Sequence, residues 1–295
     1  MKLIILLFIS LFSFPVYSND GAYKGSGNHL TPINEKDISI RKEILTIRLS
    51  RGNAEVDVYY EMYNPGKEKT VIVGFETPSP SGDVGNQLVN NGHPYMSGFT
   101  VMVNGKRQNY VINYFLDDQE GSYRSVSLPI FEEYISQYDE PNYLLSYVFP
   151  AKFKPGINII KHKYTYDMSG SIMSEFGFTY ILTAANRWAN NGIDDFTLNI
   201  YLGQERYIYI SPGFFSGLIG WKIIGKGTLL FGPTPSDEDT NERSLWCFIK
   251  KGFVQFKQKN FHPKGELSFG KPQPLWEEPI IDNWLKNNMP YKWSR

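Results

Sequence analysis

Short runs of alternating apolar and polar residues recur along most of this chain, and residues typical of turns separate them. Val71, Val73 and Phe75 share one face of such a run, as in a strand with a single buried side. The 20 Phe, 20 Tyr and 6 Trp residues are interleaved with Val, Ile and Thr, which favours strands over helices. The sequence therefore predicts an all-β fold.

Two turn sequences predict hairpins between these runs. Asn64-Pro65-Gly66-Lys67 precedes a second arm over Thr70 to Thr77. Asn104-Gly105 follows the alternating residues Phe99 to Val103, and it is a strong hairpin signal because both turn positions need positive φ. Many short strands with turns between them indicate one or two sandwich-like antiparallel domains rather than alternating strands and helices.

Short helices are expected at two places among the strands. Ile130, Phe131, Tyr134 and Ile135 have helical spacing, and the C-terminal residues Ile280 to Leu285 are amphipathic. We expect a signal peptide over residues 1–18, an N-terminal β-sandwich-like domain over 19–167, a second β-rich domain over 168–272 and a Pro-rich, then helical tail over 273–295. The Gly-rich stretch Gly21 to Gly27 is expected to be a flexible lead.

The first 18 residues have the features of a cleavable secretory signal. Lys2 precedes the apolar stretch Leu3 to Phe14, and Val16-Tyr17-Ser18 suits signal peptidase. The apolar stretch is shorter than the roughly 20 residues of a spanning helix, and no later window is long and apolar enough. We expect cleavage after Ser18, a secreted or periplasmic product that begins at Asn19, and no transmembrane segment.

Charge and cysteine content exclude several classes of protein. Thirty basic and 30 acidic residues give a net charge of zero, so there is no overall field to attract nucleic acid or an anionic membrane surface. The single cysteine, Cys247, excludes an intramolecular disulfide and lies in an apolar run, where a buried packing role is expected. The four histidines show no zinc-binding spacing, and no metal or cofactor is expected.

Three segments of the mature chain carry a family resemblance. The first segment has an Asn-Asp-x-Ala start, an Asp-Ile-Ser step and a strand pair that ends in Phe-x-x-Pro. The second is a Tyr-x-Leu-Thr stretch, followed by a Trp and an Ile-x-x-Phe strand. The third is a closing Asn-Phe-x-Pro segment. They resemble a family of exported bacterial proteins catalogued only as a domain of unknown function. The resemblance implies export and a β-rich fold, and it transfers no catalytic residue. The matching residues are Asn19, Asp20, Ala22, Asp37, Ile38, Ser39, Glu43, Leu45, Phe75, Pro78, Tyr180, Leu182, Thr183, Trp188, Ile193, Phe196, Asn260, Phe261, Pro263 and Leu267.

One candidate binding site centres on Trp188. An aromatic face beside amide and guanidinium donors suits a sugar ring, and Asn186, Arg187 and Asn190 lie close to Trp188 in sequence. The alternative interpretation is that Trp188 fills the core of the second β region.

Asp194 and Asp195 form the second candidate, because paired carboxylates perform general acid and base catalysis. Adjacent strand residues point to opposite faces, so a cap or turn role is the alternative. A hydrolase would need Glu61 as the partner of one of them.

We therefore expect an exported binding or scaffold protein of the cell envelope, with a glycan or an envelope protein as its partner. Two alternatives stay open. One is a carbohydrate-active or other hydrolase that uses carboxylates, and the other is an assembly subunit that pairs through an exposed strand edge. The sequence favours the binding or scaffold protein over an enzyme.

Overall fold

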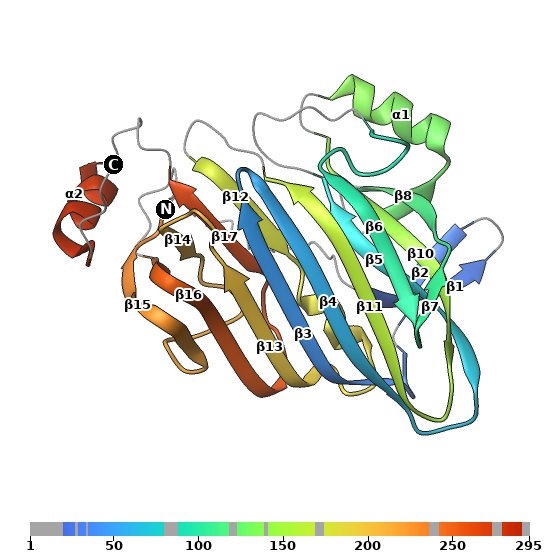
Figure 1. Ribbon diagram of the computed structural model, residues 1–295. Coiled ribbons are helices and arrows are strands. Elements are labelled where there is room, and N and C mark those ends of the chain that lie inside the picture. The colour runs from blue at the N-terminus through green and yellow to red at the C-terminus, as the bar shows by residue number, and fades with distance from the viewer. Residues whose placement is uncertain are drawn as a thin grey trace, which may run out of the picture.

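The computed structural model describes residues 20–26, 29–33, 35–79, 88–117, 123–138, 141–168, 174–235, 242–272 and 279–290. Most of these residues lie in strands, which confirms the predicted all-β class. The described strands form a six-stranded and an 11-stranded sheet, with two short α-helices at the periphery (Figure 1). The predicted signal peptide, residues 1–18, lies outside the described residues.

The larger sheet extends across the whole molecule. Its strands, in spatial order, are β12 (Ser174–Tyr180), β17 (Leu267–Pro272), β14 (Tyr207–Ile210), β16 (Arg243–Phe261), β13 (Ile193–Tyr201), β3 (Ser39–Ser50), β4 (Asn53–Asn64), β11 (Gly156–Asp167), β6 (Met96–Val103) and β7 (Lys106–Gln108). The long strand β15 (Trp221–Pro233) pairs with β16 and forms a hairpin with it. Figure 1 shows β3, β4, β11 and β6 side by side in this sheet.

The smaller sheet is antiparallel throughout and packs against one half of the larger sheet. Its order is β2 (His29–Ile33), β1 (Asp20–Ser26), β5 (Lys69–Pro78), β10 (Tyr143–Phe153), β8 (Val111–Asp117) and β9 (Tyr123–Val126). Phe75 of β5 reaches across to Phe99 of β6 and Tyr164 of β11, with ring centroids 5.3 and 5.2 Å apart. These contacts form a sandwich core between the two sheets.

The N-terminal segment departs from its prediction. Residues 20–26 form the strand β1, which pairs with β5 from Asp20↔Phe75 to Tyr23↔Ile72, instead of a flexible lead. Glycine and small residues gave no alternating pattern here, so the pairing is decided by the available edge of β5 rather than by local sequence.

Alternation along the strands gives the larger sheet two different faces. In β4, Val56, Val58 and Tyr60 are buried between the sheets, whereas Asp57 and Tyr59 lie on the opposite face. We call this second face, turned away from the smaller sheet, the outer face. It follows directly from the two-residue period of a strand.

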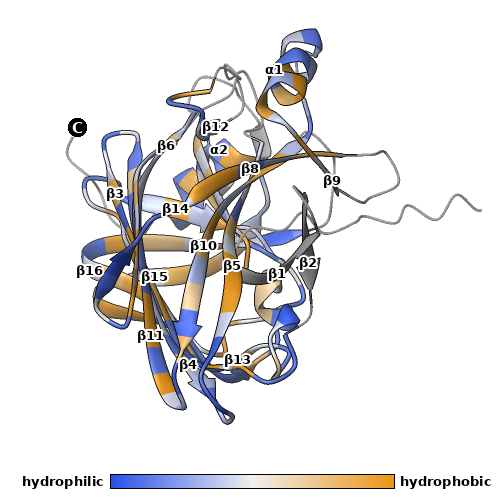
Figure 2. Ribbon diagram, turned by 90° about the vertical axis from the view of Figure 1, so that its right-hand side faces the viewer, coloured by the Kyte–Doolittle hydropathy of each residue, from blue (hydrophilic) through white to orange (hydrophobic). Residues whose placement is uncertain are grey.

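The predicted helices and the Asn104-Gly105 hairpin are confirmed. The hairpin predicted at Asn64-Pro65-Gly66-Lys67 is wrong, because β4 and β5 on either side of it lie in different sheets and the segment crosses between them. Helix α1 (Leu128–Gln137) inserts Phe131 against Tyr114 and stands at one end of β5, β8 and β10 in Figure 2. Helix α2 (Pro279–Asn288) packs on the outer face of β16, where Trp284 lies 5.0 Å from Trp246. Asn104 and Gly105 both have positive φ, 50° and 80°, as the tight turn between β6 and β7 requires.

Strands β3 and β13 join the two predicted regions by parallel pairing. The boundary predicted after residue 167 therefore falls between strands of one hydrogen-bonded sheet, and the two regions do not form separate sandwiches in it. Asn190 secures the start of this pairing. Its Nδ2 donates to the Ile40 carbonyl at 2.9 Å, and its Oδ1 accepts from the Ile40 N–H at 3.2 Å.

Replacing Asn190 should loosen this junction. Asn190→Ala leaves both backbone groups of Ile40 without their partner, so we expect a loss of about 2 kcal/mol in the free energy of unfolding. Asn199→Ala is the matched control, because Asn199 is half-buried on β13 and bonds only the Gln255 side chain. Its expected loss is about 1 kcal/mol, because one side chain, Gln255, loses a partner while the backbone groups of the junction keep theirs. Equal losses in denaturant unfolding would contradict the junction role.

Candidate functional site

The strand registers align side chains of the outer face into rows that cross the larger sheet. Opposite residues in paired strands point to the same face, so each row can be followed from strand to strand. The row that we call the Tyr59 row consists of Lys257, Thr197, Ile44, Tyr59, Lys161, Met102 and Arg107. The next row consists of Gln255, Asn199, Thr46, Asp57, Lys163 and Thr100.

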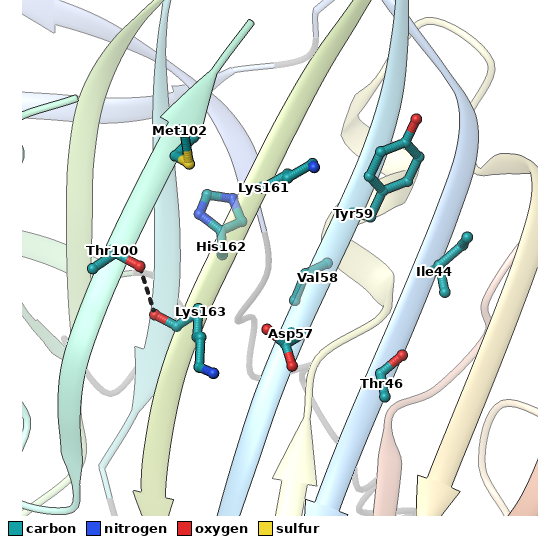
Figure 3. A pocket seen from close by; sticks show the side chains of 10 residues that line it. All are labelled: Ile44, Thr46, Asp57, Val58, Tyr59, Thr100, Met102, Lys161, His162 and Lys163. Atoms are coloured by element: carbon teal, nitrogen blue, oxygen red, sulfur yellow. Dashed lines mark hydrogen bonds between the residues drawn. The ribbon is translucent and has the colours of Figure 1, made fainter. Parts of the chain in front are cut away.

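A hollow of about 510 Å³ lies on the outer face where these two rows cross β3, β4, β11 and β6. We call it the Tyr59 hollow, and Figure 3 shows its side chains. It is lined by Ile44, Thr46, Asp57, Val58, Tyr59, Thr100, Met102, Lys161, His162 and Lys163. Val58 and His162 belong to the inner face, so the other eight residues supply the outward side chains.

Tyr59 is the aromatic residue of the hollow. The Lys161 Nζ lies 5.6 Å from the centroid of its ring, and its hydroxyl donates to Glu61 at 3.1 Å. Partial burial, followed by the hydrogen bond to Glu61 and the charge of Glu61, raises the pKa of the Tyr59 hydroxyl above its ordinary value. The hydroxyl is therefore protonated at neutral pH, and the site offers a neutral ring rather than a phenolate.

Charge is distributed unevenly over the outer face. In the neighbouring rows cations are close to acids, as in Arg48 with Asp57, Lys42 with Glu61 at 3.9 Å and Lys259 with Asp195 at 2.8 Å. The Tyr59 row contains three cations and no acid. Among the described residues, Lys161, Lys257 and Arg107 take part in no ion pair. An anionic group bound in the hollow would thus meet Lys161 without displacing a carboxylate.

The structure separates the residues of the predicted Trp188 platform. Trp188 is 1% exposed, and its ring packs in the core 6.3 Å from Phe153, so no face is available for stacking on a sugar. Arg187 points inward to Glu76 at 2.8 Å, and Asn186 donates to the Pro263 carbonyl at 2.8 Å. This corrects the stacking interpretation in favour of the alternative, a core residue with structural neighbours.

The carboxylates predicted for hydrolysis are each held by their own partners. Asp194 accepts from Arg41 at 2.7 Å and from Asn190 at 2.9 Å, whereas Asp195 pairs with Lys259. Glu61 lies two strands away on β4, opposite Lys42. Of the predicted site residues, Asn190 and Asp194 bond each other at the β3–β13 junction.

Residues of the family resemblance converge in the interior. The hydroxyls of Tyr60 and Tyr180 lie 3.4 and 3.3 Å from the Glu43 Oε1, where they donate to it, and all three side chains are buried. Glu266 accepts from the Thr183 hydroxyl and from the N–H groups of Leu182 and Thr183. This bond network joins the Tyr-x-Leu-Thr segment to the residue before Leu267. The motif positions thus describe packing of the fold.

The residues of the Tyr59 hollow were not among the sequence-based candidates. Alternation in β4 could have placed Asp57, Tyr59 and Glu61 on one face, because Val56, Val58 and Tyr60 occupy the other. Their neighbours Ile44, Lys161 and Met102 come from other strands. Only the registers show that they are adjacent. The described residues contain no group of three side chains able to hold a metal ion, and no helix among them is long and apolar enough to cross a membrane.

In its described part, the structure defines an all-β protein of two packed sheets with short peripheral helices. Residues 18–114 match the model of a family described as Domain of unknown function (DUF4424). The match covers the first of the three motif segments and confirms the resemblance to a family catalogued as a domain of unknown function. No curated protein matches the chain by sequence.

Solved structures resemble this fold at low sequence identity. A candidate nutrient binding protein from Legionella pneumophila is 16% identical, with a TM-score of 0.51, over 81% of this chain and 68% of that one. An M1 zinc metallopeptidase from Deinococcus radiodurans is 10% identical, with a TM-score of 0.29, over 81% of this chain and 43% of that one. A mutant of this peptidase is 11% identical, with a TM-score of 0.31 and the same coverage. The likeness to the Legionella protein shows the fold alone.

Glu266 should make stability depend on pH. Burial raises its pKa, the bonds from Thr183 and Leu182 lower it, and the charge of Glu76 raises it, with a net increase. The folded state therefore holds this proton more tightly than the unfolded state. The stability that Glu266 contributes is complete below the unfolded pKa of about 4.3 and is lost as the pH rises through the folded pKa.

Glu266→Gln keeps an acceptor and removes the titration. We expect the melting temperature of the wild type, relative to this variant, to fall between about pH 4 and about pH 7. Thermal unfolding across this range measures the difference. If the melting temperatures of the wild type and of Glu266→Gln change in parallel with pH, the pKa of Glu266 is not raised.

Proposed function

We propose that this protein is an exported binding protein of the cell envelope and that the Tyr59 hollow receives its ligand. The observation that carries the proposal is the combination of an aromatic ring with Lys161, a cation that takes part in no ion pair in the described structure, while cations of the neighbouring rows are close to acids. Side chains at such a place have no role in the core. Their exposure is consistent with recognition of a molecule outside the fold.

The chemistry of the hollow favours a glycan fragment that carries a carboxylate. Its volume of about 510 Å³ is within the range of small-molecule sites. Tyr59 supplies a ring face for a sugar, and Ile44 and Met102 supply apolar contacts beside it. Lys161 can pair with the carboxylate, while Thr46 and Thr100 offer hydroxyls to the sugar hydroxyls.

Binding is better supported than hydrolysis. Asp57, an acidic side chain that lines the hollow, is engaged by Arg48, and no second carboxylate lines it among the residues that the structure describes. A glycosidase needs two carboxyl groups facing one substrate, about 5 to 9.5 Å apart. The description of the Legionella protein as a candidate nutrient binding protein names the same broad class.

Assembly through a strand edge has little support at the β7 end of the larger sheet. This edge strand has three residues, Lys106 to Gln108, and two of them are exposed cations. Short, charged edge strands oppose the addition of another strand. The edge is therefore a poor template for a partner's sheet.

Tyr59→Ala should weaken ligand binding about tenfold, because it removes the stacking ring. The measurement is a screen of the full-length protein on an array of acidic glycans and peptidoglycan fragments, followed by titration of each hit. Tyr63→Ala is the matched control, since Tyr63 lies on the same strand and face and also contacts a cation, Arg41, at 4.8 Å. Equal binding by both variants, or an array without hits, would contradict this site.

Export is tested separately. Expressed in a bacterial host with its own N-terminal segment, the protein should be recovered outside the cytoplasm and begin at Asn19. Mass spectrometry of the intact protein measures the N-terminus. An intact Met1 in a cytoplasmic fraction would overturn the exported part of the proposal.

A further inference from the structure

The β15–β16 hairpin carries a concentration of positive charge that the net charge of the chain conceals. No acidic residue occurs from Arg206 to Pro235 or from Ser244 to Gly265, and these stretches contain seven lysines, at positions 222, 226, 250, 251, 257, 259 and 264. Among the described residues, Lys222, Lys226, Lys251 and Lys257 take part in no ion pair. The paired strands of the hairpin therefore form a basic surface in a protein that is neutral overall, although the sequence between them contains Asp237, Glu238, Asp239 and Glu242.

Two aliphatic side chains are exposed in the turn that leads into β15, beside the end of the paired strands where Trp221 lies opposite Phe256. We call residues 218–224 the tip. Ile219 is 89% exposed and Leu218 is 46% exposed. They occupy a turn in which the Trp221 N–H donates to the Leu218 carbonyl at 3.0 Å. Gly220 has a φ of 88°, which a side chain would not readily adopt, so the turn holds Ile219 outward. An aliphatic residue this exposed is not contributing to the fold.

The tip is rigidly supported from below. Trp221 packs on Phe215 and Phe256, with ring centroids 5.2 and 4.9 Å apart. The Lys257 N–H donates to the Gly220 carbonyl at 2.9 Å, which ties the turn to β16. The exposed side chains are therefore held in place by an ordered aromatic base.

Lysines flank the tip on the outer face of the hairpin. Lys222 pairs with Gln255, so Lys222 and Lys257 are diagonal neighbours on the same face, about 7–8 Å apart. Ile224, which is 38% exposed, follows on that face. Apolar side chains that project beyond a rim of cations match the layers of an anionic bilayer, in which acyl chains lie below charged headgroups.

We propose that the 218–224 tip and its lysines form a peripheral docking site for an anionic phospholipid bilayer. The aliphatic tip selects this partner, because a water-soluble polyanion would pair with the lysines and leave Ile219 and Leu218 in water. Basic and apolar contacts act together here, and neither alone holds a protein on a membrane stably. The site is separate from the Tyr59 hollow and extends the proposed binding function by holding the protein at a membrane surface.

The test is flotation of the protein that begins at Asn19, purified after signal cleavage, with vesicles of phosphatidylcholine alone or with about 30% phosphatidylglycerol. We expect binding to the anionic vesicles only, and loss of that binding in about 0.5 M salt. Ile219→Ser and the double variant Lys222→Gln/Lys257→Gln should each weaken binding about tenfold. Both changes are at exposed side chains, and an unchanged melting temperature verifies the fold of each variant.

Matched controls lie elsewhere on the surface. Ile157→Ser changes an aliphatic side chain that is 52% exposed on β11, and Lys106→Gln/Arg107→Gln changes two exposed cations on β7. Neither should change vesicle binding by more than about twofold. Absence of vesicle binding, or equal effects of tip and control variants, would overturn the proposal. A dimer that dissociates in Ile219→Ser, without vesicle binding, would also overturn it and make the tip a contact between copies.

Discussion

The parallel pairing of β3 with β13 is the interaction on which the rest of this structure depends. Antiparallel hairpins form from residues close in sequence, but this pair joins strands about 150 residues apart into one sheet. Asn190 completes the hydrogen bonds at its start, and Phe196 of β13 stacks on Phe261 at 4.7 Å behind it. The pairing aligns Thr197 with Ile44 and so extends the Tyr59 row from β3 to β13 and β16. The registers within the Tyr59 hollow itself come from the antiparallel pairings of β3, β4, β11 and β6.

The buried polar residues show why the family resemblance describes a fold and not an activity. Glu43, Tyr180 and Thr183 match the family pattern and lie in the interior, with Glu43 held by tyrosine hydroxyls and Thr183 held by Glu266. Buried carboxylates are costly unless hydrogen bonds compensate them, so substitutions at such positions are poorly tolerated. Residues of the hollow, by contrast, are not among the matching positions.

The net charge of zero hides local groups of like charge on the surface. Acids and bases balance over the chain, and most outer-face rows repeat that balance between neighbouring strands. The Tyr59 row and the β15–β16 hairpin depart from it, each with cations that no acid neutralises in the described structure. Salt screens electrostatic interactions beyond about a Debye length. A ligand or a membrane surface would therefore interact with these local surpluses of positive charge and not with the net charge of the chain.

The sequence by itself determined the all-β class, the Asn104-Gly105 hairpin, the two short helices and the buried position of Cys247. Each depends on local periodicity or on the backbone requirements of one or two residues. Tertiary structure alone decided that Trp188 is a core residue, that Asn190 clamps a strand and that Tyr59 lies between Ile44 and Lys161. Alternation shows which residues of one strand share a face. Which strands become neighbours is decided by long-range packing, and local sequence does not encode it.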